Sequence, residues 1–214
     1  LGMLATAGLH AFLARHSNFP KTDKIIQSMT AAYSNAGFMG IPLSLIVFGK
    51  AGLSPAIITT LFTVSFLFAL TILWIELTQL DQGQLGPAML KVGTALIKNP
   101  LLIAPILGIC WSASTLSMPS AIDRYINLLG EAATPCALVA IGLFLAANPI
   151  QSFDHSVLRI VVLKIGFQPL FTALLVLYVF DMPLMWAQIA ILSAALPVGT
   201  GPFMMAQIYR RDAS

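Results

Sequence analysis

The chain has 214 residues, of which 58% are hydrophobic and only 9% are charged, and its formal net charge is +3. Soluble domains usually carry about 25% charged residues, and a soluble core could not hide so much apolar surface. The composition therefore excludes an ordinary soluble domain and indicates an integral membrane protein. Its basic residues are scattered singly or in pairs, which disfavours nucleic-acid binding.

Seven apolar stretches are candidates for membrane helices, because about 20 apolar residues are needed to cross the hydrocarbon core. In chain order they are 1–14 (the end of a helix), 25–49, 54–77, 99–113, 128–147, 156–180 and 183–209. The apolar runs are continuous and do not alternate with polar residues, so the chain is expected to be all-α. It starts on Leu1 inside an apolar run and is expected to be a fragment of a longer polytopic protein.

The connecting loops give a test of this helix count, because seven spans make the loops alternate between the two sides of the membrane. One side would hold eight basic residues, Arg15, Lys21, Lys24, Lys91, Lys98, Arg159, Arg210 and Arg211, and the other only Lys50 and Arg124. Short loops rich in Lys and Arg stay in the cytoplasm. We therefore expect the 1–14 span to run inward and the tail after Tyr209 to be cytoplasmic.

Few ionisable or reactive side chains fall within the spans. Lys164 lies inside 156–180, where a charge is either functional or snorkels to the nearby cytoplasmic surface. Glu76 and Glu131 are near span ends and are expected at the interface. Cys110 and Cys136 are expected to be packing residues, with a disulfide left open.

Two of the spans carry helix-breaking residues near their centres. The first, 25–49, contains Gly37, Gly40 and Pro42, and the second, 183–209, contains Pro197, Gly199, Gly201 and Pro202. Proline removes a backbone donor and glycine leaves helical angles easily. The two spans would run in opposite directions, and such a pair is typical of an inverted-repeat transporter with its site at the membrane midplane. The alternative is a pair of ordinary proline kinks.

A broken helix places a helix N-terminus, with its partial positive charge, inside the membrane, where it suits a carboxylate. The Asn35 amide could donate to such a ligand, and its alternative role is a hydrogen bond between helices. Lys164 could neutralise the charge of the substrate. The expected substrate-binding residues are Asn35, Gly40, Pro42, Pro197, Gly199, Thr200 and Lys164.

Five stretches resemble the auxin efflux carrier family of membrane transporters, and within it the bacterial malate or malonate permeases. They are NAGFMGIPL (35–43), KNPLLIAPILGI (98–109), LGEAATPCALVAIGLFLA (129–146), LKIGFQPL (163–170) and AALPVGTGPFMMAQIY (194–209). The resemblance implies ten helices in two inverted five-helix repeats, whose fourth and ninth helices cross at proline-broken points. Pro42 and Pro197 would be the crossover prolines.

The resemblance also divides the chain. Residues 1–77 would be helices three to five of the transport domain, 78–98 a cytoplasmic loop, 99–147 scaffold helices six and seven, and 156–209 helices eight and nine. Helices one, two and ten would be absent. The loop at 78–98 is short, whereas the plant carriers have a long hydrophilic loop, and this favours a small organic anion over auxin.

The expected function is therefore alternating-access secondary transport of dicarboxylates such as malate or malonate, in a bacterial inner membrane. A coupling proton or sodium ion and a homodimer are further expected partners. An auxin-like carboxylate, another substrate class, and a channel or assembly subunit stay open as alternatives. An enzyme is not expected, because the Asp residues all fall in predicted loops and no HExxH motif is present. No cofactor or metal site is expected.

Overall fold

The computed structural model describes residues 1–79, 100–114, 116–147 and 155–211, with a few isolated residues between 86 and 98. Helices make up nearly all of these ranges, and they contain no named strand. This confirms the all-α fold for the described part of the chain. Two described helical stretches are long and apolar enough to cross a membrane, Ala36–Thr78 and His155–Tyr178, and the first of them turns back on itself at Gly49–Gly52.

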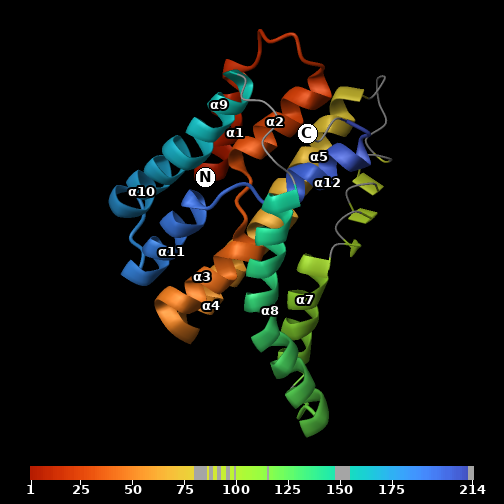
Figure 1. The fold of residues 1–214 in the computed structure, drawn as a ribbon, viewed down its shortest axis with the longest axis vertical. Helices are drawn as coiled ribbons and strands as arrows, with labels where there is room; N and C mark the ends of the chain where they lie inside the picture. Colours follow the sequence, from red (N-terminus) through yellow and green to blue (C-terminus); the bar gives the residue numbers. More distant parts are fainter. Residues whose placement is uncertain are drawn as a thin grey trace.

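The first half of the chain contains five α-helices joined by tighter or wider turns (Figure 1). In order these are α1 (Gly2–Leu13), α2 (Lys21–Ala32), the π-helix η1 (Ala36–Gly40), α3 (Ile41–Phe48), the 3₁₀ turn η2 (Gly49–Gly52), α4 (Leu53–Leu61), the π-helix η3 (Phe62–Leu67) and α5 (Phe68–Gln79).

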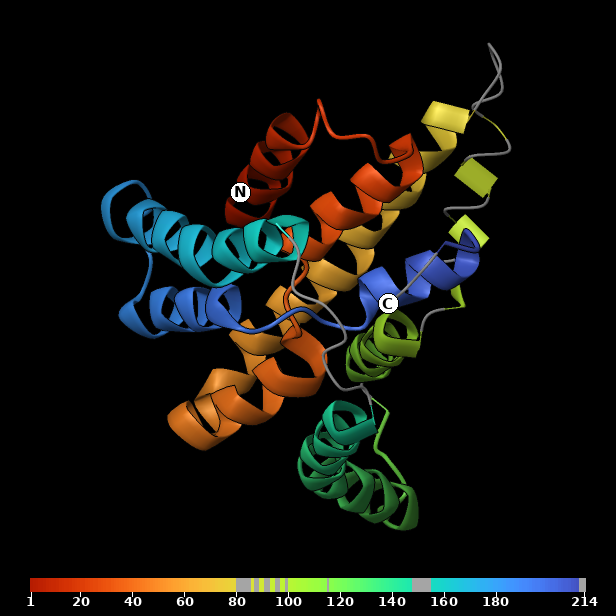
Figure 2. The same cartoon turned by 45° about the horizontal axis from the view of Figure 1, so that its top comes forward.

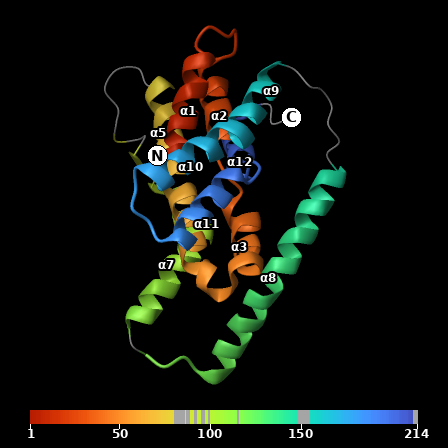
Figure 3. The ribbon, with the colours of Figure 1, turned by 90° about the vertical axis from the view of Figure 1, so that its left-hand side faces the viewer.

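The second half begins with two helices that are joined at one end and diverge from each other (Figure 3), and a second group of helices follows. Its elements are α7 (Pro100–Ala113), α8 (Ser120–Ala147), α9 (His155–Val162), the π-helix η4 (Leu163–Phe167), α10 (Gln168–Tyr178), α11 (Leu184–Ala195) and α12 (Gly201–Ile208). Figure 3 shows α7 and α8 extending away from the remaining helices. In contrast, α9 to α12 pack among α1 to α4, so the two halves interlock.

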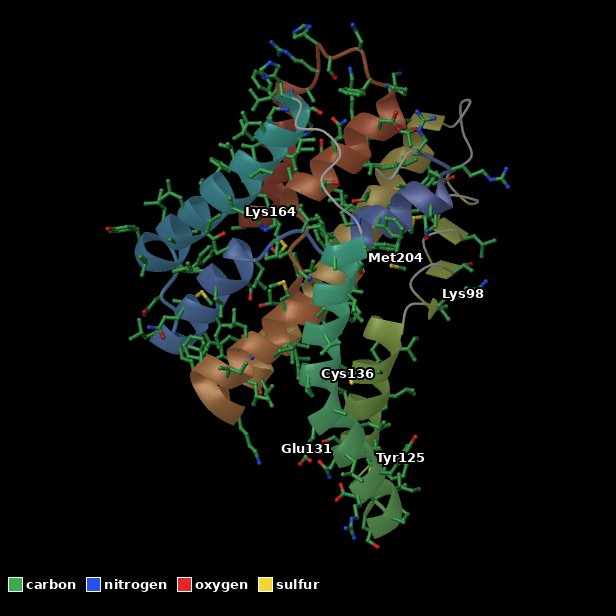
Figure 4. The ribbon with its side chains drawn as sticks, in the orientation of Figure 1. Lys98, Tyr125, Glu131, Cys136, Lys164 and Met204 are labelled. Carbon is green, nitrogen blue, oxygen red and sulfur yellow. The ribbon has the colours of Figure 1, made fainter. Side chains whose placement is uncertain are left out.

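The predicted spans agree with these helices, with one clear exception at α8. This helix begins at Ser120, whereas the span was predicted to start at residue 128. Pro119 begins the helix, since its carbonyl accepts the N–H groups of Ile122 and Asp123, and the charged residues Asp123 and Arg124 in its first turns had ended the predicted apolar span. Glu131 consequently lies well inside α8 and not at its end (Figure 4).

Two further expectations concern the two cysteines and the predicted loops. Cys110 and Cys136 are free thiols on exposed faces of α7 and α8, so the expectation that they are packing residues is wrong. Most of the predicted loop at 78–98 lies outside the described residues, as does 148–154 of the predicted loop at 148–155.

The main core lies between α1, α2, α5 and α12. Its members share low exposure and an apolar side chain, and the most buried are Met29, Ala32, Phe68, Ile72, Ile75 and Met205. At one end of this core, Arg211 forms a salt bridge with Asp23, and the Tyr209 hydroxyl donates to Glu76 Oε1 at 2.7 Å. The end of α12 therefore lies beside the start of α2 and the end of α5.

The turn between α3 and α4 depends on Gly49, which has a φ of +64°. Its ψ is −160°, and this combination of angles is essentially restricted to glycine and costs a residue with a Cβ about 1–3 kcal/mol. We expect Gly49→Ala to lower the free energy of unfolding in detergent by about 1–3 kcal/mol. The control is Gly8→Ala in α1, where a Cβ meets nothing within 4 Å and alanine favours the helix. Equal stability of the Gly49→Ala variant and the wild type would contradict the expectation.

Candidate functional site: the crossing of two interrupted helices

The first interruption lies between α2 and η1. The helix ends at Ala32, Tyr33 is extended with φ −81° and ψ 106°, and Asn35 precedes the new helix with φ −75° and ψ 54°. The predicted break in span 25–49 is therefore present, but it comes before the Gly and Pro residues that suggested it.

Gly40 and Pro42 lie inside the resumed helix. Pro42 is the second residue of α3, which follows directly on the π-helix η1. The π-turn before it, closed by the Ile41 N–H bonding to Ala36 O, widens the backbone at this point. The expectation that Pro42 marks the break is wrong, because the helix continues through it.

The second interruption lies between α11 and α12, where it was predicted. The helix ends at Ala195, Leu196 is extended with φ −62° and ψ 149°, and α12 begins at Gly201. Pro197 and Gly199 both fall within this break. Here the sequence signal and the structural break coincide.

The two breaks contact each other. Ser34 and Val198 form an isolated antiparallel bridge, in which the Asn35 N–H donates to Pro197 O at 2.9 Å and the Gly199 N–H donates to Tyr33 O at 3.2 Å. Figure 2 shows the segment between α11 and α12 passing across the segment between α2 and α3. Extended backbone in an apolar interior must find partners for its polar groups, and each break supplies them for the other.

Glycine is required where the two segments approach most closely. A Cβ on Gly199 would lie 3.1 Å from both Asn35 Cα and Ser34 O. A Cβ on Gly201 would lie 2.7 Å from Tyr33 Cε2 and 2.8 Å from Cε1, inside the ring's contact distance. Tyr33 itself is buried at 5% exposure. The glycines at 199 and 201 thus allow the crossing itself.

One side of the crossing carries the N-termini of both resumed helices, around a small pocket. Asn35 is the residue before η1 and Thr200 the residue before α12, and neither side chain makes a capping hydrogen bond. Asn and Thr commonly cap a helix in this position. Because these two do not, their side chains are available to a ligand. The lining residues come from the two breaks and from η3: Tyr33, Ser34, Asn35, Ala36, Gly37, Phe38, Thr63, Val64, Gly199 and Thr200.

The other side of the crossing carries the C-termini of α2 and α11, and two polar side chains fill it. Lys164 Nζ donates to Gln168 Oε1 at 2.8 Å, to Ala194 O at 2.9 Å and to Ser34 Oγ at 3.0 Å. Gln168 Nε2 donates to Ala32 O at 3.1 Å. Lys164 is 1% exposed and lies in the interior beside the second break (Figure 4). It therefore does not snorkel to the surface.

The structure separates the seven expected site residues. Asn35, Gly199 and Thr200 line the pocket. The Pro197 carbonyl accepts the N–H of the lining residue Asn35. Gly40 is buried, and its Cα packs close to the Leu196 side chain. Pro42 and Lys164 are not among the lining residues, and Lys164 reaches the pocket only through Ser34, which lines the pocket and accepts from Nζ.

The sequence reasoning missed Gln168, Tyr33 and Thr63. Gln168 could have been found, because it follows Lys164 by four residues in an apolar span and so shares its helix face. Tyr33 and Thr63 carry no such signal, since their positions depend on contacts with segments distant in the sequence.

A family model described as "Membrane transport protein" matches residues 87–214, which include the second break, and several similar curated proteins are auxin efflux carriers. The chain belongs to the auxin efflux carrier family of membrane transport proteins. This membrane-transport family is not one of enzymes.

Two relatives of this auxin efflux carrier family member carry names that differ in the substrate. A protein of Rhizobium meliloti (strain 1021) named "Putative malonate transporter" is 28% identical over 87% of the chain. Auxin efflux carrier component 8 of Arabidopsis thaliana is 31% identical over 56% of the chain. The chain spans 58% of the length of the first and 34% of the second.

Proposed function

We propose that this chain belongs to a secondary transporter that binds a small organic anion at the crossing and moves it by alternating access. The observation that carries the proposal is the pair of helix N-termini at one pocket, with the side chains of Asn35 and Thr200 uncommitted. Helix N-termini carry about half a positive charge each and are ready-made anion sites. A carboxylate would accept hydrogen bonds from the Asn35 amide and the Thr200 hydroxyl.

Dicarboxylates such as malonate or malate are the proposed substrates. The pocket has room for about one water molecule, so either acid would require the lining segments to move apart, and malonate would require a smaller opening than an indole ring. The name of the Rhizobium relative supports the same class. The names of the Arabidopsis relatives favour an aromatic carboxylate instead, and the experiment below separates the two.

The packing of the helices supports a proposed architecture. Residues 1–77 and 156–209 would form a transport domain, as parts of two inverted repeats, and the packing of α9 to α12 among α1 to α4 supports this grouping. The two diverging helices within 99–147 would belong to a scaffold (Figure 3). A multi-pass arrangement in a bacterial inner membrane, a homodimer and coupling to a proton or sodium ion complete the proposal.

Uptake by the complete protein in proteoliposomes tests this function. We expect saturable uptake of labelled malonate, competition by malate, little competition by indole-3-acetate, and none by the uncharged analogue malonamide. Malonate preloaded inside the vesicles should accelerate uptake, because a carrier exchanges substrate and a channel does not. Competition by indole-3-acetate alone would favour the aromatic class. Unsaturable flux would favour a channel, and no flux of any carboxylate would contradict the proposal.

A further inference from the structure

The ammonium group of Lys164 is surrounded by oxygen atoms of the kind that also coordinate metal cations. Three oxygens surround its Nζ atom, one each from a hydroxyl, a side-chain amide and a backbone carbonyl, at 2.8 to 3.0 Å. All three residues that supply them are buried: Ser34 is 1% exposed, Gln168 0% and Ala194 3%, and Lys164 itself is 1% exposed. We propose that the Lys164 ammonium is a built-in replacement for a bound alkali cation, which neutralises the two helix C-termini at the crossing.

The convergence of helix ends explains why a positive charge is needed here. Ala194 O is in the last turn of α11 and Ala32 O is in the last turn of α2. Carbonyls in a last turn lack a partner within their own helix, and together they amount to about half a negative charge at each end. In transporters with broken helices, such C-terminal ends commonly coordinate sodium. Here a lysine bonds one of these ends directly and the other through Gln168.

The three hydrogen bonds of the Lys164 ammonium group support a role in positioning its protein partners. An ammonium has three N–H donors, and Lys164 uses one for each of its three acceptors. Its donors are fully used within the protein. Lys164 therefore acts as a positioning residue that holds Ser34 and the ends of α2 and α11, while the substrate is left to Asn35 and Thr200.

Removing the amine should create a sodium site. The Lys164→Ala variant would keep Ser34 Oγ, Gln168 Oε1 and Ala194 O around a vacated volume that water and a cation can enter. Oxygen donors of this kind suit hard cations. The Lys164→Met variant keeps the volume filled with an apolar chain, so it loses the charge without making room for an ion.

Thermal unfolding in detergent tests the inference without any measurement of transport, so its result is independent of the proposed function. Each variant is melted in sodium, potassium or choline chloride at equal ionic strength. We expect Lys164→Ala to melt below the wild type in choline and to gain at least about 3 °C in sodium, since a ligand that binds only the folded state stabilises it. The gain in sodium over choline should be larger for Lys164→Ala than for the wild type, Lys164→Met or the exposed control Lys50→Ala, because a coupling sodium ion bound elsewhere would stabilise all four proteins alike.

A second pair of variants decides the matter if Lys164→Ala does not fold in any salt. Lys164→Arg keeps the charge and Lys164→Met keeps only the volume, so the account expects Lys164→Arg to melt at the higher temperature. Adding Gln168→Leu to Lys164→Ala should abolish the sodium effect, because it removes one oxygen ligand. The inference is overturned by a folded Lys164→Ala variant that is indifferent to sodium, or by Lys164→Met melting at or above Lys164→Arg.

Discussion

Replacing Asn35 with alanine is expected to weaken malonate binding at least about tenfold, which corresponds to about 1.4 kcal/mol. A hydrogen bond to a charged group contributes about 1.5–3 kcal/mol, and the Asn35 amide faces the pocket without capping its own helix. Because the side chain caps nothing, the unfolding temperature should stay close to that of the wild type. Titration of the purified complete protein with malonate measures the first quantity, and thermal unfolding measures the second.

Two further variants make the Asn35 result specific. Asn35→Asp keeps the shape of the side chain but adds a negative charge, so it should weaken binding of the dianion more than Asn35→Ala does. Asn127→Ala changes an exposed asparagine of α8, whose amide donates to the Asp123 carbonyl of its own helix, and should bind malonate normally. Unchanged binding by Asn35→Ala would remove this residue from the site.

Replacing Gly201 with alanine is expected to cost about 1–3 kcal/mol of unfolding free energy, the usual cost of overpacking a well-filled interior. The new methyl group would lie within 3 Å of several ring atoms of Tyr33, which is buried and cannot move out freely. The same displacement should pull the two breaks apart and reduce malonate uptake. Denaturant unfolding in detergent and proteoliposome uptake measure the two effects.

The ring of Tyr33 provides the control for the Gly201 variant. In a Tyr33→Ala background the alanine at 201 has no ring to meet, so the cost of Gly201→Ala should largely disappear, which is a strong coupling in a double-mutant cycle. Gly108→Ala, at a position in α7 where a Cβ meets nothing within 4 Å, should leave stability nearly unchanged. A Gly201→Ala cost that persists without the Tyr33 ring would show that the contact is not its cause.

The helices of this fold could be predicted well because the signal for a membrane-length helix is local. Apolar runs interrupted by charged loops were enough to find the spans. The start of α8 was missed because Asp123, Arg124 and Asn127 interrupt the apolar residues of 120–127, so the first turns of the helix have no continuous apolar run. Hydropathy finds the apolar part of a helix and not its full length.

The position of the first break could not be predicted from its own residues. Gly40 and Pro42 made a break plausible, but the break occurs at Tyr33–Asn35 because Pro197 and Gly199 supply its hydrogen-bond partners from about 160 residues away along the chain. The role of Lys164 was undecided for the same reason. A snorkelling lysine and a buried one look identical in sequence, and the difference depends on Ser34 and Ala194, which belong to other elements.

An experimental structure of the complete protein with malonate bound would test the central claim most directly, namely that the two helix N-termini at the crossing form the substrate site. We expect a carboxylate of malonate between Asn35 and Thr200, with Lys164 still bonded to Ser34, Gln168 and Ala194. Malonate bound to the Lys164 ammonium, or bound away from both breaks, would contradict the account.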